Sequence, residues 1–160
     1  MQDDMDDVIL KGQAIDYLVN NLTTKIEKLS LPCAAITDEQ VKTLVSRCNK
    51  LSVLDLSHPG GSYETRRILT GNSITYIIKH LKPTLEELNV QGCENLSYEK
   101  LVQLRSMPHL KKLKIEMWDD NEDFQRLKRE MPHVEFTDSG CEFRQWKDDS
   151  KRFWELNMDQ

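Results

Sequence analysis

The chain has 160 residues, of which 38% are hydrophobic and 31% charged, and this size fits one domain. Its formal net charge is −5, and aspartates at positions 3, 4, 6 and 7 supply four of those charges, so the rest of the chain is nearly neutral. A nearly neutral body lacks the basic footprint of a nucleic-acid-binding protein. No apolar run approaches the roughly 18 residues of a membrane helix. We therefore expect neither a nucleic acid nor a membrane as a partner.

The first 25 residues combine an acidic tail with a short helical pattern. Ile15, Leu18 and Leu22 have helical spacing, and the strand of the same unit is expected at 8–10. We assign residues 1–25 to an acidic tail and an N-terminal half-repeat or cap. The segment has neither a signal-peptide h-region nor an Arg-rich transit pattern. We expect a cytoplasmic or nuclear protein, or a mitochondrial one if a transit peptide has been removed.

The body of the sequence repeats an L-x-x-L-x-L pattern. Full copies begin at Ile26, Leu51, Leu85 and Leu110, and a truncated copy begins at Val134, at intervals of 25, 34, 25 and 24 residues. Three of these four intervals fall in the leucine-rich-repeat range, and such self-similarity is typical of a solenoid. The sequence therefore predicts an α/β leucine-rich-repeat solenoid over residues 26–137, with a curved parallel sheet on the concave side and helices on the convex side.

Each strand motif is followed by apolar residues at helical spacing. Thr37 followed by Gln40 has capping-box spacing and predicts a helix start, and Asp120 or Asn121 is expected to cap the last helix. The column leucines Leu29, Leu54, Leu88 and Leu113 are expected to stack in one buried column. We expect strands at 29–31, 54–56, 88–90 and 113–115, and helices near 38–47, 73–82, 98–106 and 121–130.

Two copies continue into a cysteine and then a helix start. Residues 29–33 read LSLPC and are followed by ITD at 36–38, and residues 88–93 read LNVQGC and are followed by NLS at 95–97. This phrasing resembles the cysteine-containing leucine-rich repeats of F-box substrate receptors and antagonist-of-mitotic-exit-like proteins. The resemblance implies that the repeats hold a substrate while an F-box binds the Skp adaptor. No F-box is visible here, so we expect the Skp adaptor only if an F-box lies outside this chain.

The four cysteines are 15, 45 and 48 residues apart, which leaves no C-x-x-C pair. Cys33 and Cys93 fall near one repeat position, where a small side chain fits under a turn, and Cys48 lies at a helix end. We expect these three to be reduced, buried and free of metal, with Cys141 as the one reactive thiol. We expect no cofactor and no bound metal.

The longer second interval predicts an insertion at about 57–72. Insertions in solenoids collect on one face, often the binding face. The insertion carries Tyr63, Arg66 and Arg67, which are residue types that anchor protein partners. The sequence leaves open whether this segment is a contact loop or a neutral spacer.

Strand alternation predicts which side chains face away from the helices. Together with the insertion residues, we expect the following to contact a partner: Asp55, Asn89, Gln91, Lys112, Lys114 and, just past the fourth strand, Trp118. The alternative is a face that is merely solvated. The last segment, 138–160, is rich in aromatic residues and is expected to cap the final repeat or to cross the concave face.

The sequence offers no catalytic constellation. The four histidines are scattered, and no Ser-His-Asp or Cys-His arrangement falls on one surface of the predicted repeats. We therefore expect a non-catalytic protein-recognition module that binds a protein partner or a peptide degron. The leading interpretation is the substrate-binding repeat domain of an F-box-type ubiquitin ligase receptor. The alternative is a repeat scaffold or assembly factor, for example of a mitochondrial complex, with no link to ubiquitin.

Overall fold

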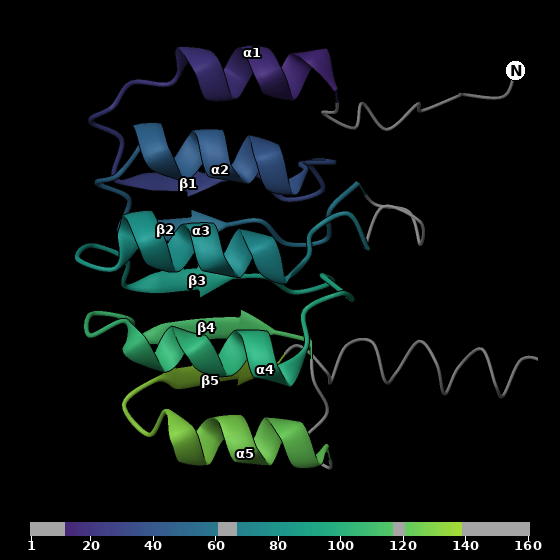
Figure 1. Ribbon diagram of the computed structural model, residues 1–160, viewed down its shortest axis with the longest axis vertical. Helices are drawn as coiled ribbons and strands as arrows, with labels where there is room; N and C mark the ends of the chain where they lie inside the picture. The colour runs from purple at the N-terminus through teal and green to yellow at the C-terminus, as the bar shows by residue number, and fades with distance from the viewer. Residues whose placement is uncertain (1–11, 61–66, 117–120, 139–160) are drawn as a thin grey trace, which may run out of the picture.

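The computed structural model describes residues 12–60, 67–116 and 121–138, which form an α/β fold with one parallel five-stranded sheet. The strands follow one another in chain order, and Figure 1 shows the helices stacked in the same order as one layer against them. The elements are α1 (Gln13–Asn21), β1 (Lys28–Ser30), α2 (Asp38–Arg47), β2 (Val53–Asp55), α3 (Gly71–Leu81), β3 (Glu87–Asn89), α4 (Tyr98–Leu101), the 3-10 helix η2 (Val102–Ser106), β4 (Lys112–Ile115), α5 (Glu122–Glu130) and β5 (Glu135–Asp138).

The α/β class and the parallel pairing predicted from the sequence are confirmed. The truncated last motif forms β5, which pairs with β4. The strand expected at 8–10 lies outside the described residues, as do the aromatic residues of the C-terminal segment, so those two predictions remain as they were made.

The strand register places the column leucines side by side. Leu54, Leu88 and Leu113 are partners across β2, β3 and β4, and all three are fully buried. Leu29 is in register with Leu54 but is only half-buried, because β1 pairs with one described strand and not two. The prediction of one uniformly buried column is therefore wrong at Leu29 and right at the three central strands.

The helices begin at side-chain caps that the sequence carries. Thr37 and Gln40 form the predicted capping box of α2, which spans the predicted range. Asn121, not Asp120, caps α5 by accepting from two backbone N–H groups. α3 begins two residues earlier than predicted, because the Thr70 hydroxyl accepts from the Asn72 N–H at 3.2 Å. The helix predicted at 98–106 is instead a short α4 that continues as η2.

The carboxylate of Asp38 joins the starts of α2 and α3. Its Oδ1 accepts from the Thr70 N–H at 2.9 Å and from the Ser73 hydroxyl at 2.5 Å, and its Oδ2 accepts from the Thr70 hydroxyl at 2.6 Å. Ser73 is only 2% exposed, so its hydroxyl depends on this partner. One carboxylate therefore holds two neighbouring helices in register.

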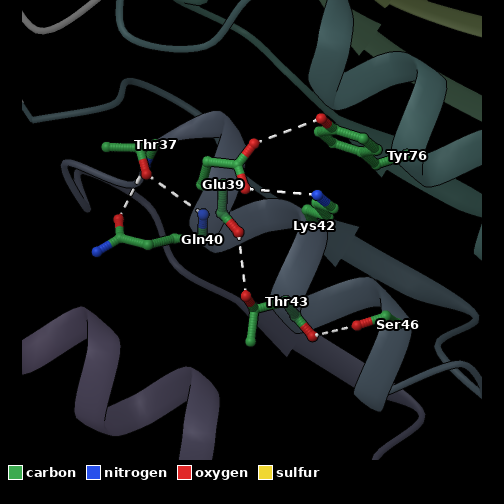
Figure 2. A network of polar contacts seen from close by, with 7 residues as sticks. All are labelled: Thr37, Glu39, Gln40, Lys42, Thr43, Ser46 and Tyr76. Carbon is green, nitrogen blue, oxygen red and sulfur yellow. Dashed lines mark hydrogen bonds and ion pairs between the residues drawn. The ribbon is translucent and has the colours of Figure 1, made fainter.

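A second contact between α2 and α3 lies at the surface. Figure 2 shows Tyr76 of α3 beside Glu39 and Lys42 of α2. The tyrosine hydroxyl donates to Glu39 at 3.5 Å, and the Lys42 Nζ lies 5.5 Å from the ring centroid and 3.6 Å from Glu39. Glu39 and Lys42 are largely exposed, so their ion pair adds little stability compared with the core, against which Tyr76 is partly packed.

A left-handed residue follows the strand in three successive units. Cys33, His58 and Gly92 have φ angles of 61°, 50° and 73°, and each lies four residues after its column leucine. Cys33 therefore corresponds to Gly92 and not to Cys93, which corrects the predicted alignment of the cysteines. Cys33 is exposed, contrary to the prediction, whereas Cys93 is buried and its thiol donates to the Leu56 carbonyl at 3.6 Å.

Gly92→Ala is expected to lower the free energy of unfolding by about 1–3 kcal/mol, from left-handed strain and overpacking. An added Cβ would lie 2.6 Å from the His58 Nδ1 and 3.1 Å from its Cα. Urea denaturation measures the change. In a His58→Ala background, part of the cost should disappear, because the ring contact is gone. A cost unchanged by His58→Ala would show that the ring is not the obstacle.

Candidate partner-binding face

Six half-buried side chains of β2, β3 and β4 lie together on one face of the sheet. The buried leucines point to the opposite face. Two register rows supply the six side chains: Val53, Glu87 and Lys112 form one row, and Asp55, Asn89 and Lys114 form the other. With the strand leucines they line a groove of about 80 Å³, which we call the strand groove. Four of the predicted site residues, Asp55, Asn89, Lys112 and Lys114, therefore lie together.

Asp55 uses both of its carboxylate oxygens within the fold. Oδ1 accepts from the Ser57 N–H at 2.9 Å, and Oδ2 accepts from the Ser30 hydroxyl of the neighbouring strand at 3.0 Å. The first bond is the side-chain-to-backbone bond that allows aspartate to start a turn. Asp55 thus fixes the end of β2 and its link to β1, in addition to lining the strand groove.

Asn89 holds the corresponding turn after β3, because its Oδ1 accepts from the Gln91 N–H at 3.1 Å. The turn ends the strand alternation, and Gln91 is only 9% exposed. Ser57, which follows Asp55 in the same way, is 4% exposed. The prediction that Gln91 is open to a partner is therefore wrong, because its side chain is almost fully buried within the protein.

The two lysines of β4 differ in their surroundings. The Lys112 Nζ lies 3.8 Å from the Glu87 Oε1, a loose ion pair in which both side chains remain more than 40% exposed. No hydrogen bond or ion pair of the Lys114 ammonium group is found among the described residues. Lys114 is flanked in register by Asn89 on β3 and Thr137 on β5, which are both neutral.

Of the remaining predicted site residues, Arg67 belongs to the described part of the chain and does not line the strand groove. Arg67 is exposed, and its Nε lies 3.6 Å from a carboxylate oxygen of Glu94, outside the groove lining. Tyr63, Arg66 and Trp118 lie outside the described residues. The ends of the predicted insertion belong to the fold, because Ser57 and Leu69 are buried and residues 71–72 begin α3.

A larger cavity of about 260 Å³, which no sequence motif predicts, lies at the carboxyl ends of β3 and β4. Its lining residues are Val90, Cys93, Glu94, Leu96, Leu101, Ile115, Glu116 and Asn121. They come from the loop after β3, from α4, from the end of β4 and from the N-cap of α5, so no local pattern could indicate the cavity. Its lining includes Glu116 and Asn121, which border residues outside the described part, so the strand groove is the better defined candidate site.

Burial raises the pKa of the Cys93 thiol to about 12, and the carboxylates of Asp55 and Glu116 add to this effect. Burial also raises the pKa of Cys48, against a smaller lowering by Arg47. Both thiols therefore stay protonated at neutral pH, and the thiolate is the reactive form.

A disulfide reagent at pH 8 is expected to modify Cys33 quickly and to reach Cys48 and Cys93 only on unfolding, because raising the pKa of these buried thiols keeps their thiolate fraction small. Cys33→Ser should remove one fast equivalent, and Cys93→Ser should remove none. Fast modification of native Cys93 would contradict its burial. The exposure of Cys33 contradicts the prediction that all three repeat cysteines are buried, whereas Cys141 lies outside the described residues and its expected reactivity stays a prediction.

No family model and no curated protein matches this chain. Across 12–60, 67–116 and 121–138, no three His, Cys, Asp or Glu side chains converge as metal ligands would. None of the helices in these ranges has both the length and the apolarity needed to cross a bilayer.

Proposed function

We propose that this chain is a non-catalytic protein-recognition module that binds a protein partner or a peptide degron in the strand groove. The observation that carries the proposal is the convergence of Asp55, Asn89, Lys112 and Lys114 from three adjacent strands around one groove. Charged and polar side chains at fixed strand positions can discriminate partners by complementary charge. The groove lies away from the helix layer, so a partner could reach it without disturbing the core.

We further propose that the fold is a leucine-rich-repeat solenoid. Three features support this: the strands pair in chain order, the column leucines share one register, and a left-handed residue recurs four positions after three of them. Together with the sequence period, these features are those of a stacked repeat array. In such an array the strand groove belongs to the concave side.

The cysteine-containing motifs favour the substrate-binding part of an F-box-type ubiquitin ligase receptor. A repeat scaffold or assembly factor unconnected with ubiquitin is the second candidate, because the same groove could hold a subunit of a complex. Copurification of the Skp adaptor with the full-length gene product would support the first. Copurification of one stable complex without the adaptor would support the second.

Lys112→Glu and Lys114→Glu are each expected to weaken binding of a copurified partner by about 2 kcal/mol, roughly 30-fold, as is common for residues central to an interface. The assay is titration calorimetry with the purified partner. Lys42→Glu, on the exposed surface of α2, and Lys50→Glu, in the turn before β2, are matched controls. Equal loss in all four variants, or loss only in the controls, would contradict the proposed face.

A further inference from the structure

We propose that the strand groove recognises one acidic side chain, an aspartate or glutamate of an extended partner segment, at the position between Lys114 and Asn89. This inference rests on the proposed function and specifies the chemistry of its ligand. It follows from which hydrogen-bonding groups the fold already uses and which it leaves for a ligand.

The acceptors of this register row are engaged within the protein. Both oxygens of Asp55 and the Oδ1 of Asn89 accept hydrogen bonds from neighbouring groups at 2.9–3.1 Å. Because Oδ1 of Asn89 faces a backbone N–H, the other end of its amide is the NH₂ group, a donor. The Lys114 ammonium group is also a donor. In this row, the hydrogen-bond donors are therefore more available to a ligand than the acceptors are.

The charges point to the same position. Glu87 and Lys112 offset one another in their own row. Lys114 has neutral register neighbours on both sides, and Asp55 lies two strands away, a separation of about 10 Å, close to the screening length of physiological salt. Of the two lysines that line the strand groove, Lys112 has Glu87 and Glu135 as register partners, whereas Lys114 has no carboxylate as a register partner. A carboxylate would complement the positive charge of Lys114 through a charge-assisted hydrogen bond.

The size of the groove fits a single short side chain. Its volume is about 80 Å³, whereas one water molecule needs roughly 15 Å³ of such space. The room is enough for the end of one side chain. Val53 supplies an apolar part of the groove lining in the adjacent row.

The test uses the full chain and an array of immobilised ten-residue peptides with random flanks and one fixed central residue. The central residue is Asp, Glu, Asn, Lys or Arg. Wild-type protein is expected to be retained about tenfold more on the Asp and Glu arms than on the Asn arm, which is isosteric with the Asp arm, because a hydrogen bond to a charged group contributes at least that factor.

Two variants and one control locate the effect. Asn89→Asp keeps the acceptor for the Gln91 N–H but replaces the NH₂ donor by a negative oxygen, so it should abolish the acidic preference without changing the thermal midpoint. Lys114→Glu should reverse the preference in favour of the Lys and Arg arms. Lys50→Glu makes the same charge change outside the groove lining and should leave the preference unchanged.

Equal retention on the Asp and Asn arms, or an acidic preference that survives both Asn89→Asp and Lys114→Glu, would overturn the inference. The binding of the same variants to the copurified partner is measured as well. If Lys114→Glu abolishes partner binding while the array shows no acidic preference, the recognition face stands and the acidic ligand is wrong. If neither readout responds to either variant, the proposed function fails as well.

Discussion

Leu88→Ala is expected to lower the free energy of unfolding by about 2–5 kcal/mol, the range of large-to-small substitutions in a packed core. Leu88 is 1% exposed and lies in register between Leu54 and Leu113, which are also buried. Strands on both sides hold the walls of the resulting cavity, so the structure cannot collapse around it. Urea denaturation should show a lower midpoint with an unchanged m-value.

Leu29→Ala makes the same chemical change at the edge of the same column. Leu29 is only half-buried, and β1 pairs with β2 alone among the described strands. Leu29→Ala is therefore expected to lower the free energy of unfolding by less than half as much as Leu88→Ala does, because it removes less buried apolar surface and the site can relax. Equal losses at the two positions would contradict the burial gradient across the sheet.

The sequence period was sufficient to predict most helices and to predict the strands to within one residue, since each begins one residue earlier than expected. Alternation around the column leucines and the capping box at Thr37 are local signals, and local signals determined α2 to the residue. The split of α4 from η2 could not be predicted, because Leu101, Leu104 and Met107 are spaced by three, which fits a 3-10 helix as well as an α-helix.

The candidate site was predicted in part, and its errors have physical causes. Asp55, Asn89, Lys112 and Lys114 lie on strands, where alternation dictates the face. Gln91 lies beyond the strand end, where its N–H donates to the Asn89 Oδ1 and strand alternation no longer predicts which side chains are exposed. The cysteines were misaligned by one residue, because the left-handed position is defined by backbone φ and not by residue type.

Asp38→Ala is expected to lower the free energy of unfolding by about 2–4 kcal/mol. Hydrogen bonds to a charged group are strong, and a buried donor left without an acceptor is destabilising. The substitution removes the acceptor for the Thr70 N–H, for its hydroxyl and for the buried Ser73 hydroxyl. No local pattern could predict this carboxylate's role, because its partners lie 32 and 35 residues away. Hydrogen exchange at the Thr70 amide should accelerate in the variant.

Two substitutions separate this cross-helix role from the ordinary effect of a carboxylate at a helix start. Glu122 occupies the same first helical position in α5 but has no hydrogen bond to another helix among the described residues. Glu122→Ala should therefore cost only about 0.3–1 kcal/mol, the helix-dipole contribution. Asp38→Asn keeps one carbonyl oxygen for Thr70 and Ser73 and should fall between the two. A cost for Asp38→Ala no larger than that for Glu122→Ala, with an unchanged Thr70 exchange rate, would show that α2 and α3 are held together by their apolar faces alone.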